Sequence, residues 1–214
     1  INALNILGLI YTQEKYFQIN TDNAIHYLLL GAQKNIKSSL CCLGELYYNG
    51  KYVKQDINKA IYYLKQAADQ NDASAQYNLG FIYEKMQEIK KSIFYYSLAA
   101  NQGDENALIN LGTIYYYGTK CKRDISKAIH YFTLAANKNN PLAQTYLGII
   151  YSNYDNNKSL NYFLLAANQN EENAQYFLGL SYYKGEKVKR DYSKAIHYLT
   201  LASQKNEFRS NLLL

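Results

Sequence analysis

Apolar and polar positions recur along this chain with the spacing of helices that bury one face. Leucine followed by glycine occurs six times, and successive pairs lie 31 to 36 residues apart. A tyrosine stands three residues after each glycine, so leucine, glycine and tyrosine share one side of a helix. The glycines of these pairs are Gly8, Gly44, Gly80, Gly112, Gly148 and Gly179. We therefore predict six copies of a first helix, called helix A.

A second helix, called helix B, follows each helix A. Eleven to sixteen residues after the glycine comes a small residue, followed three positions later by tyrosine and then by a pair of small residues such as Ala67-Ala68. Repetition of a two-helix unit predicts an all-α solenoid of about six antiparallel helix pairs that bury each other's apolar faces. The expected units of this single domain, 1–214, span 1–36, 37–72, 73–104, 105–140, 141–171 and 172–207, and 208–214 would begin a further repeat.

Local signals mark the ends and the contacts of these helices. Typical N-cap residues precede helix B at Asp56, Asp124 and Asp191, and precede helix A at Asp72, Asp104 and Asn140. One position of the turn after helix B holds only asparagine or glycine, which tolerate left-handed backbone. Its six residues are Asn35, Asn71, Gly103, Asn139, Asn170 and Asn206. Glycine inside a helix costs about 1 kcal/mol relative to alanine, so we expect each Leu-Gly pair to lie at a close helix contact.

The segment LGELYYNGKYVKQDINKAIYYLKQAA, residues 43–68, resembles the Sel1-like repeat, a relative of the tetratricopeptide repeat. The second, fourth and sixth units carry nearly the whole pattern, while the third and fifth lack the long loop between the helices. Tyr52, Lys120 and Lys187 replace a loop glycine of the family, and Cys121 replaces its valine. The resemblance implies a right-handed superhelix of helix pairs and a role as an adaptor for other proteins.

Composition and sequence pattern bear on membrane insertion and on the redox environment of the chain. The chain has 214 residues, a net charge of +6, one proline and 25 tyrosines. No apolar run approaches the roughly 18 to 20 residues that a membrane span needs, and no basic and then apolar leader opens the sequence. Three cysteines without CxxC or Cys/His spacing do not form a disulfide framework, which favours a reducing compartment such as the cytoplasm.

The residues that could carry chemistry fit structural roles better. His26, His130 and His197 share a repeat position that holds Tyr62, Phe94 and Asn161 in the other units, which indicates packing or solvent exposure. Cys121 and Cys42 are expected to be small buried apolar residues, and Cys41 is expected in a groove. All 11 glycines have a place in the repeat, so none remains for a phosphate-binding loop. We predict no enzyme activity, no metal site and no cofactor.

The residues three before, one after and four after each glycine share one face of helix A, since they lie at i, i+4 and i+7. This face is apolar and aromatic, and we expect it to form a concave groove that binds a peptide or protein segment. In the alternative interpretation, its rings only pack against adjacent helices. The groove residues are Cys41, Glu45, Tyr48, Tyr77, Phe81, Glu84, Ile109, Thr113, Tyr116, Thr145, Ile149, Ser152, Tyr176, Leu180 and Tyr183.

The long loops carry a second surface, a basic edge that could meet an acidic partner. Its residues are Lys51, Lys54, Lys120, Lys122, Arg123, Lys187, Lys189 and Arg190. Solvated loop lysines are the simpler interpretation. An RNA-binding solenoid that uses these loops and the tyrosines is the alternative function, and it predicts strongly salt-dependent binding. Nucleic acid is the less favoured partner, and a protein or peptide is the favoured one.

Overall fold

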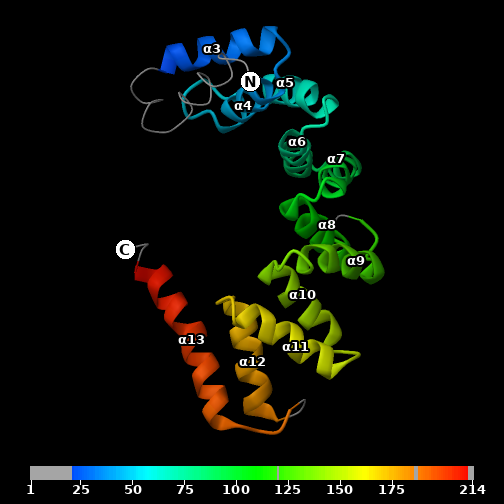
Figure 1. The fold of residues 1–214 in the computed structure, drawn as a ribbon, viewed down its shortest axis with the longest axis vertical. Helices are drawn as coiled ribbons and strands as arrows, with labels where there is room; N and C mark the ends of the chain where they lie inside the picture. The colour runs from blue at the N-terminus through cyan, green and yellow to red at the C-terminus, as the bar shows by residue number, and fades with distance from the viewer. Residues whose placement is uncertain (1–20, 120, 186–187, 212–214) are drawn as a thin grey trace. The chain divides into compact units, whose positions relative to one another are not determined.

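The computed structural model describes residues 21–119, 121–185 and 188–211 (Figure 1). Within these ranges the chain forms eleven α-helices and no strand, which confirms the all-α prediction. The helices are α3 (Thr21–Gln33), α4 (Lys37–Asn49), α5 (Ile57–Asp69), α6 (Ala73–Lys85), α7 (Ile89–Asn101), α8 (Glu105–Tyr117), α9 (Ile125–Ala136), α10 (Pro141–Tyr151), α11 (Asn156–Ala167), α12 (Glu172–Lys184) and α13 (Tyr192–Asn211). The even-numbered helices are the copies of helix A, and the odd-numbered helices are the copies of helix B.

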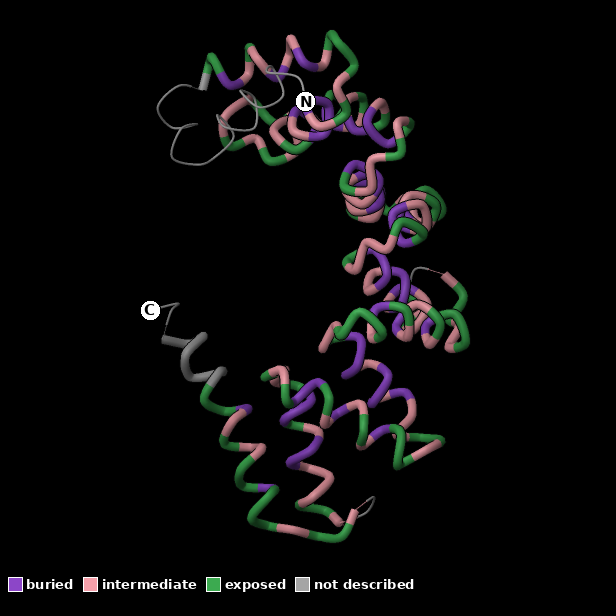
Figure 2. Tube along the Cα trace, viewed as in Figure 1, coloured by how far each residue is buried: buried purple, intermediate pink, exposed green. Residues whose placement is uncertain are grey.

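The chain divides into two compact units, Ile1–Leu111 and Gly112–Leu214, and each is described by itself. In the first unit α4 packs on α5 and α6 on α7, and in the second α10 packs on α11 and α12 on α13. Helix A also contacts helix A of the next repeat, as α4 with α6 and α10 with α12. Buried residues follow the sides on which paired helices meet (Figure 2).

The predicted close contacts are confirmed at the five Leu-Gly pairs within the described residues, and the sixth, at Gly8, lies outside them. A Cβ added to Gly80 would lie 2.5 Å from Cδ1 of Tyr96, and one added to Gly148 would lie 2.6 Å from Cδ1 of Phe163. At each of these five pairs the opposing side chain stands four residues after the small residue of helix B, as Tyr96 does after Ser92. Glycine is therefore retained because a large helix B side chain fills the space that a methyl group would need.

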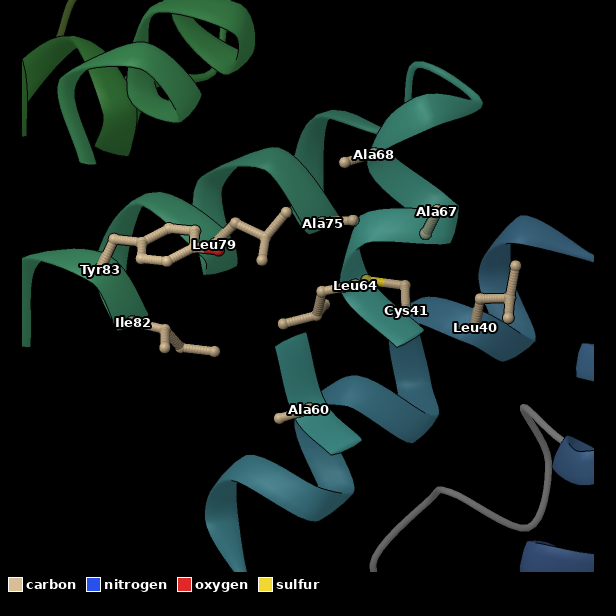
Figure 3. Close-up of a cluster of buried hydrophobic side chains, with 10 residues drawn as sticks. All are labelled: Leu40, Cys41, Ala60, Leu64, Ala67, Ala68, Ala75, Leu79, Ile82 and Tyr83. Atoms are coloured by element: carbon tan, nitrogen blue, oxygen red, sulfur yellow. The ribbon is translucent and has the colours of Figure 1, made fainter. Parts of the chain in front are cut away.

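The core of the first unit gathers side chains from three successive helices. Leu40 and Cys41 of α4, Leu64 of α5, and Leu79 and Ile82 of α6 belong to one buried cluster (Figure 3). In the second unit a cluster around Phe163 and Leu178 joins α11 to α12. Each cluster crosses from one repeat to the next, so neighbouring repeats stabilise each other.

The predicted N-caps are confirmed. The carboxylate of Asp56 accepts a hydrogen bond from N of Lys59 at 2.9 Å, and the same bond forms at the other five predicted caps. Asp155 and Glu171 cap α11 and α12 in the same way, which the sequence pattern had not indicated. Each cap satisfies an amide that would otherwise lack a partner at the helix end.

The left-handed turn is confirmed at five of the six predicted positions, and its φ values run from 56° at Asn35 to 84° at Gly103. At Asn206 the prediction is wrong, because α13 continues through that residue to Asn211. The turns elsewhere let the next helix A pack back on helix B. Asparagine tolerates the left-handed conformation but does not require it, and Asn206 takes helical backbone instead.

A lysine, a carboxylate and two tyrosines form the same cluster in five repeats. In the second repeat the ammonium of Lys59 lies 5.1 Å from the ring centre of Tyr47 and 4.0 Å from Asp56, and the Tyr47 ring stacks on Tyr63 at 5.8 Å. The corresponding lysines of the other four are Lys91, Lys127, Lys158 and Lys194. We call this arrangement the lysine–tyrosine cluster; it joins helix A to helix B of one repeat.

Candidate functional site

A pocket of about 240 Å³ opens between α4 and α6, the helix A elements of two successive repeats. We call it the α4/α6 pocket. Its lining consists of Glu45, Tyr48 and Asn49 of α4, Leu64 of α5, and Tyr77, Asn78, Phe81 and Ile82 of α6. Four of these, Glu45, Tyr48, Tyr77 and Phe81, are predicted groove residues, which the packing of α4 on α6 brings together.

A carboxylate and an amide of the pocket lining are bonded to each other across the two repeats. Nδ2 of Asn78 donates to Oε1 of Glu45 at 2.8 Å, and Sγ of Cys41 donates to the same oxygen at 3.8 Å. Glu45 is exposed and Asn78 half-buried. Asn78 thus fixes the carboxylate at the edge of the pocket from the neighbouring repeat.

The aromatic side of the pocket is held by ring contacts. Tyr48 meets Phe81 edge to face with their centres 5.9 Å apart. Tyr77 packs on the buried ring of Tyr96 at 5.7 Å, and the Tyr96 hydroxyl donates to Glu84 at 2.9 Å. Burial raises the pKa of Tyr77 and of Tyr96, so both keep their hydroxyl protons at neutral pH. These rings are ordered before any partner binds.

A second pocket, the α10/α12 pocket, also measures about 240 Å³ and lies in the second unit. It is lined by Ile149, Ser152, Phe163, Phe177, Leu180, Ser181 and Lys184. Phe163 stacks on Phe177 at 5.2 Å and closes its floor. The hydroxyls of Ser152 and Ser181 donate to carbonyls of their own helices, at Ile149 and Phe177. This pocket is apolar, with one cation, Lys184, at its edge.

The remaining predicted groove residues line neither pocket. Tyr176 and Tyr183 are 48% and 57% exposed, while Ile109 and Thr113 are half-buried. Tyr116 packs against Tyr146 at 5.8 Å and lies beneath the guanidinium of Arg123. Thr145 is buried, and its hydroxyl donates to Glu171 at 2.7 Å. The predicted face of helix A thus includes both open and internal positions.

The cysteines are placed differently from their predictions. Cys41, expected in the groove, is only 7% exposed and belongs to the core, whereas Cys42 and Cys121, expected to be buried, are half-buried. Helix α4 is rotated so that position 41 faces α5 and α6. Burial raises the pKa of both adjacent thiols, that of Cys42 to about 11, so neither is a ready nucleophile.

The three histidines are exposed, as expected of a packing or solvent position. Each imidazole meets the ring of the next residue edge to face, as His130 meets Tyr131 with the ring centres 5.2 Å apart. Within the part of the chain that the structure describes, no three His, Cys, Asp or Glu residues gather closely enough to hold a metal ion.

Two members of the predicted basic edge donate to the last turn of the helix A that precedes their loop. Nε of Arg123 donates to the carbonyl of Tyr116 at 3.0 Å, and Nη2 of Arg190 donates to that of Lys184 at 3.2 Å. Gln55 makes the same bond in the second repeat, to Tyr48. These side chains close the long loops onto helix A. The exposed lysines of this edge are Lys51, Lys54, Lys122 and Lys189, whereas Lys120 and Lys187 lie outside the described residues.

Sequence reasoning missed several pocket residues. Asn78 and Phe177 stand two positions before the glycine of their helix, and Ile82 and Ser181 stand two after it. The positions two before and two after the glycine face the preceding repeat. Their fixed spacing from the glycine is the sequence signal that could have identified these pocket residues. Leu64 and Phe163 reach the pockets from helix B, over the same glycines whose lack of a side chain admits them.

The helix pairs define an α-helical repeat protein of the solenoid class. The family model of the Sel1 repeat matches residues 1–36, 39–72, 73–104, 106–140, 141–171 and 173–207, so the chain belongs to the Sel1 repeat family. A comparison with curated proteins gives no match. Among the described residues, no helix is both long and apolar enough to cross a membrane.

Solved structures show the same fold. The chain is 25% identical to c5321, a protective antigen present in uropathogenic Escherichia coli strains, with a TM-score of 0.85 over 95% of this chain. It is 29% identical to a Sel1 repeat protein from Oxalobacter formigenes, with a TM-score of 0.77 over 94% of this chain and 86% of that one. The chain spans 46% of the c5321 chain, about half its length.

Proposed function

We propose that this chain is a non-catalytic scaffold that binds a peptide or protein segment against its helix A surface. Sel1-like repeat proteins generally mediate protein–protein interaction. The observation that carries the proposal is the α4/α6 pocket, which combines three aromatic rings, an apolar floor and a fixed carboxylate. Such a combination of apolar walls and few polar groups is typical of recognition sites.

The energetics of the pocket support binding by this surface. Tyr48, Tyr77 and Phe81 are half-buried, so a bound segment would remove further ring surface from water. Apolar surface contributes about 25 cal/mol per Å² when it is covered. Since the rings already hold one another in place, little side-chain entropy would be lost on binding.

A peptide-display selection tests the proposal. A random peptide library is selected on the protein, and the affinities of enriched peptides are measured by calorimetry for wild type and for the double variant Tyr77→Ala, Phe81→Ala. We expect at least a tenfold loss, because two aromatic anchors are removed. The matched control is Tyr62→Ala with Phe94→Ala, which removes two exposed rings from helices α5 and α7.

The control should leave affinity unchanged, and circular dichroism should show both double variants folded. A selected peptide that binds wild type and both variants equally would place its binding elsewhere and overturn the proposal. A selection that enriches no binding peptide would also count against it.

A further inference from the structure

We propose that the α4/α6 pocket binds the side chain of an arginine in the bound segment. This inference rests on the function proposed above and names the chemistry of the partner. Two free acceptors, an apolar channel and aromatic faces meet in one pocket of about 240 Å³. A guanidinium on an aliphatic stem matches all three.

Glu45 and Asn78 each present an acceptor oxygen at the pocket edge. Oε1 of Glu45 is used by Asn78 and Cys41. Within the described residues, no hydrogen bond or ion pair reaches Oε2 of Glu45 or Oδ1 of Asn78. Because the Asn78 amide donates to Glu45, its carbonyl oxygen is fixed beside the carboxylate. A ligand with several donors and a positive charge satisfies both oxygens, and a charged partner strengthens each bond.

The walls favour arginine over lysine. Leu64 and Ile82 provide apolar surface for the methylene stem, and Tyr48 and Tyr77 contribute aromatic rings to the lining. A planar guanidinium can stack on a ring while donating in its plane to two acceptors, whereas an ammonium is more strongly hydrated. The ammonium of Lys85 already lies 5.2 Å from the centre of Phe81, so that ring is the less available one.

The α10/α12 pocket provides an internal control. At the registers of Glu45 and Asn78 it carries Ile149 and Phe177, neither of which offers a side-chain acceptor. Lys184 at its edge stands at the register of Lys85 beside the first pocket, so the two acceptors, and not the lysine, distinguish the pockets. The two pockets have the same size, and only the α4/α6 pocket offers acceptors at these registers, so arginine should bind to the α4/α6 pocket alone.

The test uses the tripeptide acetyl-Leu-Arg-Leu-amide as probe, with citrulline in place of arginine as its neutral isostere. Binding is followed by NMR shifts of the backbone amides of Asn78 and Ile82, with those of Ile149 and Leu180 as reference. We expect saturable shifts only at the first pair, with at least fivefold weaker binding of the citrulline probe. Glu45→Gln should weaken the arginine probe at least fivefold. Asp69→Asn, which makes the same charge change on exposed α5 surface outside the pocket, should not.

The outcomes separate this inference from the proposed function. If citrulline binds as well as arginine, if Glu45→Gln has no effect, or if no shift occurs at Asn78, the arginine assignment is overturned. Display-selected peptides that require Tyr77 and Phe81 but carry no arginine would also overturn it, while the scaffold function would stand.

Discussion

The α4/α6 and α10/α12 pockets are built at the same registers of the repeat and differ in chemistry. Gly44 and Gly148 admit a helix B side chain to the floor in both, Leu64 in one and Phe163 in the other. At the edge, Glu45 and Asn78 of the first correspond to Ile149 and Phe177 of the second. The glycines therefore keep the same helix packing in both pockets, while the side chains around them differ and determine what each pocket can bind.

The substitutions with the largest expected effect on stability test whether the helix contact at the glycine is equally close in both units. Gly80→Ala and Gly148→Ala place a methyl group about 2.5 Å from a buried ring, that of Tyr96 or Phe163. Overpacking of this kind costs about 1 to 3 kcal/mol, and we expect both variants to lose unfolding free energy in urea titrations. Asn161→Ala, at an exposed position of α11, is the control and should change little. Stabilisation by about 1 kcal/mol, as in an unpacked helix, would contradict the contact.

The second substitution gives the α10/α12 pocket a carboxylate like that of the α4/α6 pocket. Ile149→Glu introduces a carboxylate at the register of Glu45, and we expect the arginine probe to acquire affinity for the α10/α12 pocket. A hydrogen bond to a charged group contributes roughly 1.5 to 3 kcal/mol, about tenfold or more in affinity. NMR shifts at Leu180 measure the gain. Ile149→Gln has nearly the same shape without the charge; if it takes up the probe equally, charge does not distinguish the pockets.

The smallest effect concerns two buried serines at one register of helix B. Oγ of Ser159 donates to the carbonyl of Gly148 at 2.8 Å, whereas Oγ of Ser92 has no partner within the described residues. Ser159→Ala should lose about 1 kcal/mol of unfolding free energy with its bond. Ser92→Ala should gain up to about 1 kcal/mol, because an unsatisfied hydroxyl leaves the core. Thermal and urea unfolding measure the unfolding free energy of each variant. If both variants change it in the same direction, the two hydroxyls are equivalent and the prediction is contradicted.

The fold could be predicted because its determinants are local and repeated. The Leu-Gly pairs identified the helix contacts, and Asp56, Asp72 and Asn140 identified helix starts from residue type alone. Asn206 shows the limit of this reasoning. Its residue type allows a left-handed turn but equally allows helical backbone, so residue type alone does not specify where the helix ends.

The candidate site could be predicted only in part, because it depends on how one helix A is rotated against the next. The i, i+4, i+7 rule found Glu45, Tyr48 and Phe81. The same rule included Cys41 and Thr145, which the stacking of repeats turns inward. It omitted Asn78, whose role requires contact with Glu45 of another repeat. Likewise, the bonds of Arg123 and Arg190 to helix A carbonyls depend on loop paths that composition does not reveal.

The lysine–tyrosine cluster has a consequence for how such chains grow. Its lysine, carboxylate and two rings all come from a single repeat, as Lys59, Asp56, Tyr47 and Tyr63 do. Duplication or loss of a whole repeat therefore carries the complete cluster along and strands no charge or ring in a neighbour. A gene that gains or drops one repeat keeps this joint between helix A and helix B intact in every repeat that has it, so the cluster does not oppose a change of array length by single repeats.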